Sequence, residues 1–325
     1  MLRILHDTHY DFIKYWRHAA ILTIAFIVVG LTALVVRGAR YSIEFTGGTM
    51  MQLDFAKPPN PDVIRSTVDA AGYTGSTIQQ FGSPTSFTIN AQNKGGAVGL
   101  QATDSTVKVL GAALHAKFGD TTQVRIGQSQ YISAQVGAEL RRNAILAVLI
   151  SFLVTLIYLA IRFEWRFGVA AVVATAHDIF TTLAFLAMLR LEVSLTVVAA
   201  ILTVIGYSLN DTIIIFDRVR EDLRKGRKES LRDTMNRAIN ETLPRSILTH
   251  VTTLAATLAL LVFAGEVIRP FSWIMAFGIF TGTFSSIYVA GALLLWIEAK
   301  WPRTVEGQGG ANAAAAAARR RQVSP

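Results

Sequence analysis

The sequence predicts a polytopic α-helical membrane protein with six transmembrane helices and an α+β external domain between helices 1 and 2. Two observations carry this prediction. Of the 325 residues, 52% are hydrophobic and only 16% are charged, which is a composition typical of membrane proteins. Six predominantly apolar runs are each long enough to cross roughly 30 Å of hydrocarbon. They cover residues 19–36, 143–161, 167–189, 193–216, 246–265 and 271–297.

The first run is expected to be an uncleaved anchor. Residues 1–18 precede it as a cytoplasmic N-terminus, and residues 19–36 form transmembrane helix 1. Arg37 and Arg40 stand where a signal peptide would have its small-residue cleavage site. The chain contains no cysteine, so disulfides and thiolate metal sites are excluded, and we expect no metal site.

The orientation follows from the basic residues. They gather before helix 1, between helices 2 and 3, between helices 4 and 5 in a basic loop at residues 218–244, and after helix 6. The positive-inside rule places all of these in the cytoplasm, with both termini, and places residues 37–140 outside as a periplasmic domain. The net charge of +9 is thereby explained without a nucleic-acid partner. Residues 141–301 hold helices 2 to 6, and residues 302–325 are expected to be a disordered cytoplasmic tail whose arginines lie near anionic membrane lipid.

The external segment has the pattern of a small α+β domain. "YSIEFTG" and "TMMQLDF" read as strands around Gly47 and Gly48, and "NPDVIRSTVDAAG" reads as a helix with an Asn cap and proline in its first turn. "STIQQFG" and "TSFTINA" alternate like strands, "DSTVKVLGAALHAKFG" is a second helix, and "TQVRIGQSQ" is a last strand. The order βαββαβ after a leading strand predicts a ferredoxin-like domain.

The cytoplasmic loop contains a second amphipathic stretch, "SLRDTMNRAINETLP". Its apolar residues share one helical face, which predicts a helix resting in the membrane interface and ended by Pro244. In the last transmembrane run, Gly278 and Gly282 have the four-residue spacing that lets helix backbones approach closely.

Asp211 is the only charged residue between Glu192 and Asp217. It lies roughly 27 Å along helix 4, where an ionised carboxylate is costly unless paired. Arg245 at the mouth of helix 5 is its candidate partner, because Thr249 continues the same face inward, and Asn210 adjoins the acid. The alternative interpretations are that Asn210 and Asp211 only hydrogen-bond to a neighbouring helix, and that Arg245 only anchors the topology.

Further titratable groups lie in the same helices. His177 and Asp178 fall near the membrane midplane in helix 3, where they either pair to lock two helices or join a proton relay. His250 lies on a polar strip beside Arg245 and can titrate near neutral pH. Asp217 and Arg218 are interpreted as an interfacial ion pair. Gly47 and Gly48 are interpreted first as a tight turn and second as a hinge.

Three of these stretches resemble the SecF family, the smaller half of the SecDF protein-export accessory complex in the resistance-nodulation-division superfamily. They are "YSIEFTGGT", "GYSLNDTIIIFDRVRE" and "LPRSILTHVTT". By this resemblance, Asp211 matches the proton-responsive aspartate of helix 4, Arg245 matches the arginine that faces it, and Gly47 and Gly48 match the paired glycines of the external motif. Glu44 stands where the family more usually has Asp, and His250 where it more usually has a small residue.

The resemblance implies an accessory subunit of the Sec protein translocase in the bacterial inner membrane, and not an enzyme. It would use the proton-motive force, without another cofactor, to promote late steps of export. The implied partners are SecD, the SecYEG translocon, YajC or YidC, and an exported unfolded polypeptide. Sodium is an alternative coupling ion, since an Asp beside Asn and hydroxyl oxygens can also bind it. The rival interpretations are a proton-coupled half-transporter for lipid or small molecules, and a non-conducting scaffold for a SecD-like partner.

Overall fold

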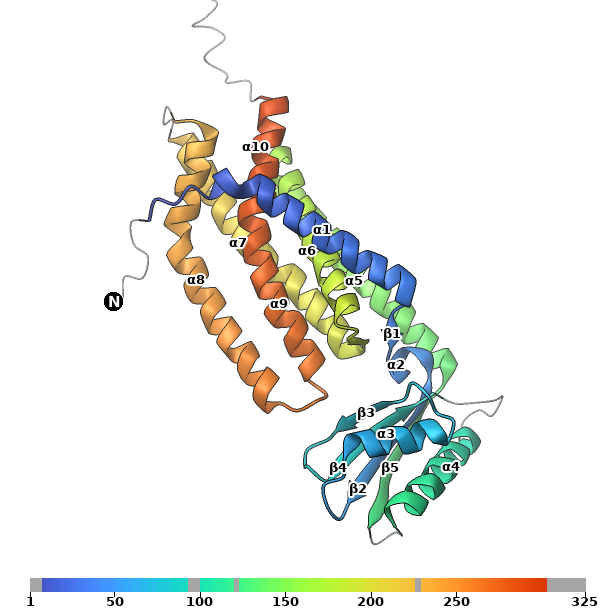
Figure 1. Ribbon diagram of the computed structural model, residues 1–325. Coiled ribbons are helices and arrows are strands. Elements are labelled where there is room, and N and C mark those ends of the chain that lie inside the picture. The colour runs from blue at the N-terminus through green and yellow to red at the C-terminus, as the bar shows by residue number, and fades with distance from the viewer. Residues whose placement is uncertain (1–7, 93–99, 120–122, 226–228, 303–325) are drawn as a thin grey trace, which may run out of the picture.

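A computed structural model describes residues 8–92, 100–119, 123–225 and 229–302 of the chain. It contains six helical spans long and apolar enough to cross a membrane, as the composition predicts, and an α+β domain beyond one end of the bundle (Figure 1). The spans are η1 (Phe12–Tyr15) with α1 (Trp16–Arg37), α5 (Ala134–Arg162), α6 (Trp165–Met188), α7 (Leu195–Arg224), α8 (Leu231–Phe263), and α9 (Arg269–Ser285) with the π-helical turn η2 (Ser286–Ala290) and α10 (Gly291–Lys300).

Three of the spans form the centre of the bundle. About half of the apolar window of α6, α7 and the α9–α10 span is buried within the protein, against about a tenth of α1, α5 and α8. The packing role expected of the two glycines is confirmed. A Cβ on Gly278 would lie 2.2 Å from Val204 Cγ2, and one on Gly282 would lie 3.1 Å from Ser208 Cα. The glycines therefore allow α9 to approach α7 closely.

The external domain has the predicted ferredoxin-like arrangement. Its elements are β2 (Gly48–Phe55), α3 (Pro61–Ala70), β3 (Thr77–Gln80), β4 (Ser86–Ala91), α4 (Leu100–Phe118) and β5 (Val124–Ile132). The four strands are antiparallel in the order β3-β4-β2-β5, so each βαβ unit encloses a strand of the other. Leu53 and Ile89 of the sheet and Ile64, Leu110 and Leu114 of the helices are fully buried between the layers.

The expected leading strand is wrong over most of its length. Ile43–Thr46 forms a helical turn, α2, and the strand that precedes it, β1, covers just Arg40–Tyr41. β1 does not join the domain sheet but pairs in parallel with β6 (Glu192–Val193), in the connection between α6 and α7. Ile43 and Phe45 alternate as in a strand, yet both are buried because α2 is enclosed between the domain and α5.

The segment expected as a cytoplasmic loop, 218–244, is largely helical. α7 continues to Arg224, and α8 runs through Pro244 without ending there. The predicted amphipathic helix does have an apolar face. However, Met235, Ala238 and Ile239 on that face pack into the core of the bundle and not into the membrane interface. A proline removes a single hydrogen bond from a helix, and that loss is tolerated where neighbouring helices support it. The tail expected to be disordered lies, from residue 303 onward, outside the described residues.

The connections between helices that carry the basic residues lie together at the end of the bundle opposite the domain. Arg162 at the end of α5 binds Asp217 of α7 at 2.6 Å, and Arg166 at the start of α6 lies 3.4 Å from Glu298 of α10. The expected pair between Asp217 and Arg218 is therefore wrong. Adjacent helical residues do not face each other, and Arg218 binds Glu241 and Glu221 instead.

Candidate functional site: buried carboxylates in the bundle

Asp211 lies on α7 with 3% of its surface exposed, facing α8. Its Oδ2 atom is 3.2 Å from Nε2 of His250, whose side chain is also largely buried. Tyr207, one turn earlier on α7, places its ring against the imidazole with the centroids 5.4 Å apart, and its hydroxyl donates to the Thr249 carbonyl at 3.4 Å. The acid is thus in direct contact with a histidine enclosed between two helices.

Arg245 does not make the contact expected of it. It is exposed and forms no ion pair with Asp211 within 4.0 Å, so its charge reaches the carboxylate only at longer range. The Thr249 hydroxyl donates back to the Arg245 carbonyl at 2.9 Å, within the same helix. Arg245 and His250 are five residues apart, about 140° around a helix, and so cannot both face α7 squarely. Asn210 is also exposed, since it is turned about 100° away from Asp211.

A second buried carboxylate, Asp178, ties three helices together. Its Oδ2 accepts hydrogen bonds from Ser285 of α9 at 2.6 Å and from Ser208 of α7. Its Oδ1 lies 3.0 Å from Nδ1 of His177, the preceding residue on α6. The expected His177–Asp178 pair therefore exists, but it does not lock two helices. The interhelical links come from the two serines.

The two carboxylates belong to one buried polar row. Ser208, bonded to Asp178, lies about one helical turn from Asp211 on the same helix. Thr212, next to Asp211, shares a hydrogen bond of 2.8 Å with Ser286, which follows the Ser285 that binds Asp178. Ser286 also begins the π-helical turn η2, and such turns are frequent at functional sites.

Sequence reasoning did not assign chemistry to the hydroxyls of this row. Ser208, Thr212, Ser285 and Ser286 are all at most 3% exposed. The available signal was their spacing, because Ser208 and Thr212 are one turn apart in a largely apolar part of the helix, beside Asp211. Within the described ranges no three His, Asp or Glu side chains converge as metal ligands.

Gly47 and Gly48 lie where the bundle joins the external domain. Gly47 ends α2 with φ +76°, and a Cβ there would lie 2.7 Å from the backbone nitrogen of Ala134, at the start of α5. A Cβ on Gly48 would lie 2.6 Å from the Ala91 carbonyl. The pair is therefore not a turn between two strands. It is a tightly packed connection between α2 and β2 that no larger residue fits.

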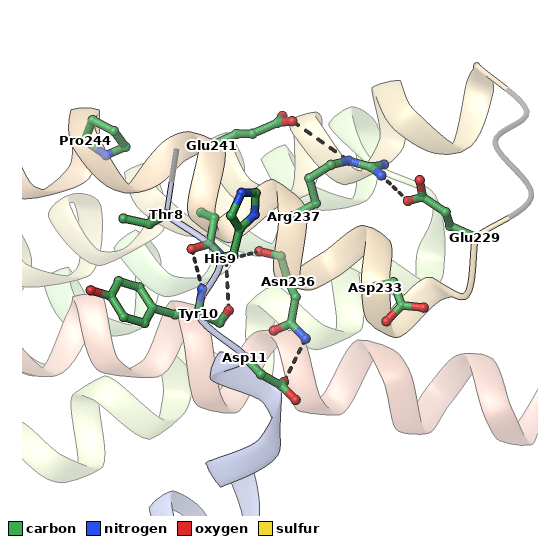
Figure 2. Close-up of a pocket in the computed structure, with 11 residues that line it drawn as sticks. Thr8, His9, Tyr10, Asp11, Glu229, Asp233, Asn236, Arg237, Glu241 and Pro244 are labelled. Atoms are coloured by element: carbon green, nitrogen blue, oxygen red, sulfur yellow. Dashed lines mark hydrogen bonds and ion pairs between the residues drawn. The ribbon is translucent and has the colours of Figure 1, made fainter. Parts of the chain in front are cut away.

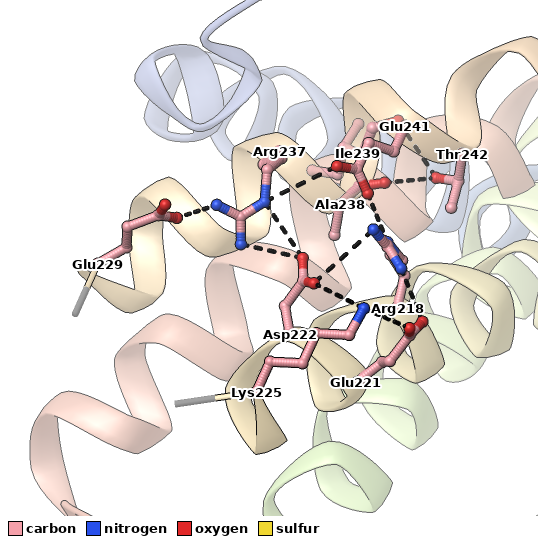
Figure 3. A network of polar contacts seen from close by, with 10 residues as sticks. All are labelled: Arg218, Glu221, Asp222, Lys225, Glu229, Arg237, Ala238, Ile239, Glu241 and Thr242. Atoms are coloured by element: carbon pink, nitrogen blue, oxygen red, sulfur yellow. Dashed lines mark hydrogen bonds and ion pairs between the residues drawn. The ribbon is translucent and has the colours of Figure 1, made fainter. Parts of the chain in front are cut away.

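The opposite end of α7 is held to α8 by ion pairs (Figure 3). Asp222, whose side chain is fully buried, accepts from Arg237 at 3.0 Å and lies 3.7 Å from Arg218. Arg237 also binds Glu229, and Arg218 also binds Glu241. The same part of α8 and the N-terminal segment, residues 8–11, together line a pocket of about 600 Å³ (Figure 2). Asn240 exchanges two hydrogen bonds with the Tyr10 backbone there, at 2.9 and 3.0 Å.

Comparison with known proteins identifies the family of the chain. Residues 113–300 match the family described as protein export membrane protein SecD/SecF, C-terminal, and residues 32–59 match the SecD/SecF GG motif, which spans Gly47 and Gly48. The protein translocase subunit SecF of Gemmatimonas aurantiaca is 59% identical over 306 residues, covering 93% of this chain and 91% of that protein. The SecF of Vibrio alginolyticus is 38% identical, covering 92% of this chain and 94% of the relative.

A solved structure shares the fold as well. The crystal structure of SecDF, a translocon-associated membrane protein from Thermus thermophilus, matches 92% of this chain with a TM-score of 0.77 and 32% identity. This chain spans 40% of the length of that SecDF chain. Both the sequence relatives and the shared fold agree with the motifs read from the sequence. The chain therefore belongs to the SecF family of protein translocase subunits, as a multi-pass membrane protein.

Proposed function

We propose that this chain uses the proton-motive force to promote late steps of protein export, through loading and release of a proton on Asp211. The observation that carries the proposal is the position of that carboxylate, buried between α7 and α8 with the His250 imidazole 3.2 Å away. Ionisable residues inside a membrane span are rare and are functional by default. A second buried acid, Asp178 of α6, accepts hydrogen bonds from Ser208 of the same α7 helix and from Ser285 of α9.

The proposed cycle works through the charge of the site. While Asp211 is ionised, it contacts the His250 imidazole at close range, as an ion pair when the ring carries a proton, and it attracts Arg245 at longer range. These interactions hold α8 against α7. A proton on the carboxylate neutralises it and weakens that attraction, so that a different packing of the two helices becomes favourable. Release of the proton to the other side restores the first packing.

The driving force is sufficient for such a change. One proton moving through about 100 mV carries roughly 2.3 kcal/mol, which shifts a two-state equilibrium by about fiftyfold or less. The work delivered is movement of the external domain against an exported, unfolded polypeptide. No bond in that polypeptide is made or broken.

The proposed surroundings follow from the family. SecD is the partner that completes the assembly, and SecYEG supplies the polypeptide, with YajC or YidC as further associates. The chain lies in the bacterial inner membrane with both termini in the cytoplasm and the α+β domain outside. The clustering of Arg162, Arg166 and Arg218 at the bundle end away from the domain supports this orientation.

Membrane vesicles that carry the chain with SecD test the coupling ion. The measured quantity is completion of a translocation intermediate under an imposed proton gradient or an imposed sodium gradient. The proposal expects completion to accelerate with the proton gradient, and Asp211→Asn to remove that acceleration. If only the sodium gradient accelerated completion, the coupling ion would be sodium and not the proton. If neither gradient had an effect, the chain would be a non-conducting scaffold.

A further inference from the structure

The first turn of α7 is capped by a residue from a distant part of the chain. The backbone N–H of Leu195, the first residue of α7, donates to Glu44 Oε2 at 2.7 Å, across 151 positions of sequence. The side chain of the N-cap residue Ser194 accepts from the N–H of Val197 at 3.3 Å and shares a hydrogen bond with the Thr196 hydroxyl at 2.7 Å, so it does not cap Leu195. A carboxylate at a helix N-terminus is favourable because it satisfies a free N–H and complements the helix dipole.

The backbone around Glu44 is bound to the same connection. β1 pairs with β6 in register, Arg40 opposite Glu192 and Tyr41 opposite Val193. The Ser42 N–H then donates to the Val193 carbonyl at 3.0 Å. The pairing of β1 with β6 and the Glu44 side chain therefore join the segment after α1 to the residues that begin α7. Figure 1 labels β1 and α2 in that segment, between the bundle and the domain.

The helical turn that carries Glu44 also holds both ends of the external domain. β2 begins at Gly48, directly after α2, while β5 leads into α5. A Cβ on Gly137 of α5 would lie 2.9 Å from the Gly47 nitrogen and 3.0 Å from the Phe45 carbonyl carbon. Contacts this close leave little room for α2 to move independently of α5 and the domain.

We propose that Glu44 is a positioning residue that couples displacement of α7 to displacement of the external domain. Asp211 lies about 16 residues into α7, or roughly 24 Å from Leu195 along a continuous helix. A shift of α7 at Asp211 is carried to its first turn, and the Leu195–Glu44 hydrogen bond passes it to α2 and the domain. This inference rests on the proposed function, since Asp211 supplies the displacement.

Two substitutions remove this hydrogen bond from opposite sides. Glu44→Ala removes the acceptor, and Leu195→Pro removes the donor. Proline is well tolerated at the first position of a helix, and the extended ψ of 171° at Ser194 suits a residue that precedes proline. Leu195→Ala is the matched control, because it loses the side chain and keeps the N–H. If the Glu44→Ala protein fails to accumulate, Leu195→Pro alone still tests whether the hydrogen bond couples α7 to the domain.

The chain lacks cysteine, so pairs of introduced cysteines can carry spin labels without background. One pair reports the domain, with Ser66→Cys on α3 and Val267→Cys in the connection between α8 and α9, both exposed. The other reports the bundle, with Ile161→Cys on α5 and Leu248→Cys on α8, also exposed. Distances are measured for the full chain with a cysteine-free SecD in liposomes, at high and low pH and with Asp211→Asn.

In the otherwise unmodified chain, both label pairs are expected to change distance with pH, and Asp211→Asn should abolish the change. With Glu44→Ala or Leu195→Pro, the distance between the bundle labels should still change with pH. The pH-dependent shift in the populations seen by the domain labels should fall about tenfold, which corresponds to the loss of one charge-assisted hydrogen bond. The two substitutions together should do no more than either alone.

A domain response that survives both substitutions overturns the coupling role of Glu44 and leaves the proposed function intact. Equal loss in Leu195→Ala and Leu195→Pro overturns it as well, because the N–H would not be the cause. Absence of any pH response in the unmodified chain contradicts the proposed function itself, and the coupling with it.

Discussion

His250 Nε2 lies 3.2 Å from Asp211 Oδ2, across the interface between α8 and α7. This contact places a titratable base, and not the exposed Arg245, directly against the central acid of the bundle. The Tyr207 ring, one turn earlier on α7, also contacts the imidazole, in an edge-to-face arrangement. In the proposed relay, Asp211 and His250 therefore form the central pair. The charge of Arg245 acts on that pair at longer range.

This geometry predicts that Asp211 is energetically coupled more strongly to His250 than to Arg245. A thermal double-mutant cycle combining Asp211→Asn with His250→Phe should give a coupling energy of about 1–3 kcal/mol, because the two groups are in contact and largely buried. The matched cycle with Arg245→Ala should give a smaller value, since that charge is exposed. A larger coupling to Arg245 would show that the close Asp–His contact is not the main interaction.

Asp178 should matter more for stability than either serine that binds it. Asp178→Ala leaves the Ser208 hydroxyl and the His177 Nδ1 atom without this partner, and each unsatisfied buried group costs about 1–3 kcal/mol. Ser285 loses its bond to the carboxylate and keeps the one to the Gly282 carbonyl. Ser285→Ala removes one donor only. The melting temperature of the purified protein in detergent should fall further for Asp178→Ala. Equal melting temperatures for the two variants would contradict the three-helix role of the carboxylate.

The contact between α7 and α9 predicts opposite effects for two glycine substitutions. Gly278→Ala puts a Cβ 2.2 Å from Val204 Cγ2, so it should destabilise the protein by about 1–3 kcal/mol through overpacking. Gly206→Ala, on α7, meets no atom within 4 Å and should be neutral or stabilising by up to about 1 kcal/mol. Thermal unfolding of both variants measures this difference. Equal destabilisation at the two positions would argue against the close approach of α9.

Glu192 predicts a pH dependence of the connection between the bundle and the domain. Burial raises the pKa of its carboxyl above 4.5 and the neighbouring Glu44 adds to the rise, while Thr77 and Arg40 oppose it. The folded state therefore holds this proton more tightly than the unfolded chain does. Its contribution to stability is complete below pH 4.5 and is lost as the pH rises through the raised pKa.

Unfolding temperatures measured between acidic and neutral pH test this sign. Relative to Glu192→Gln, which does not titrate at this position, the unmodified protein should lose stability as the pH rises. Glu139→Gln, at an exposed position on α5, should follow the unmodified protein. Parallel curves for the unmodified protein and Glu192→Gln would contradict a buried, proton-retaining Glu192.

The six spans and the βαββαβ order were predictable because they rest on local patterns. Long apolar runs and alternating strands are visible in the sequence at any position. Residues 43–46 were misread because two alternating apolar residues fit a strand and a single enclosed helical turn equally well. Pro244 was misread as a helix end because the packing of α8 against α7 and α9, which supports the helix, is not visible in the local sequence around the proline.

The candidate site was predictable only in part, for a similar reason. An acid in an apolar run identifies Asp211 without any tertiary information. Which basic side chain faces Asp211 depends on the rotation of α8 about its axis. The packing of α8 against α7 and α9 sets that rotation. The hydroxyl row through Ser208, Ser285 and Ser286 joins three helices, so no one segment contains it. The pairing of β1 with β6 is equally non-local.

The central claim is that ionisation of Asp211 drives the work of export. Its most direct test is the secretion of a pulse-labelled precursor in cells whose only copy of this chain carries Asp211→Asn, with membrane levels of the chain measured alongside. The account predicts normal levels of the protein and slowed completion of export. Export at the unmodified rate, with the protein present in normal amount, would contradict it and make Asp211 a packing residue.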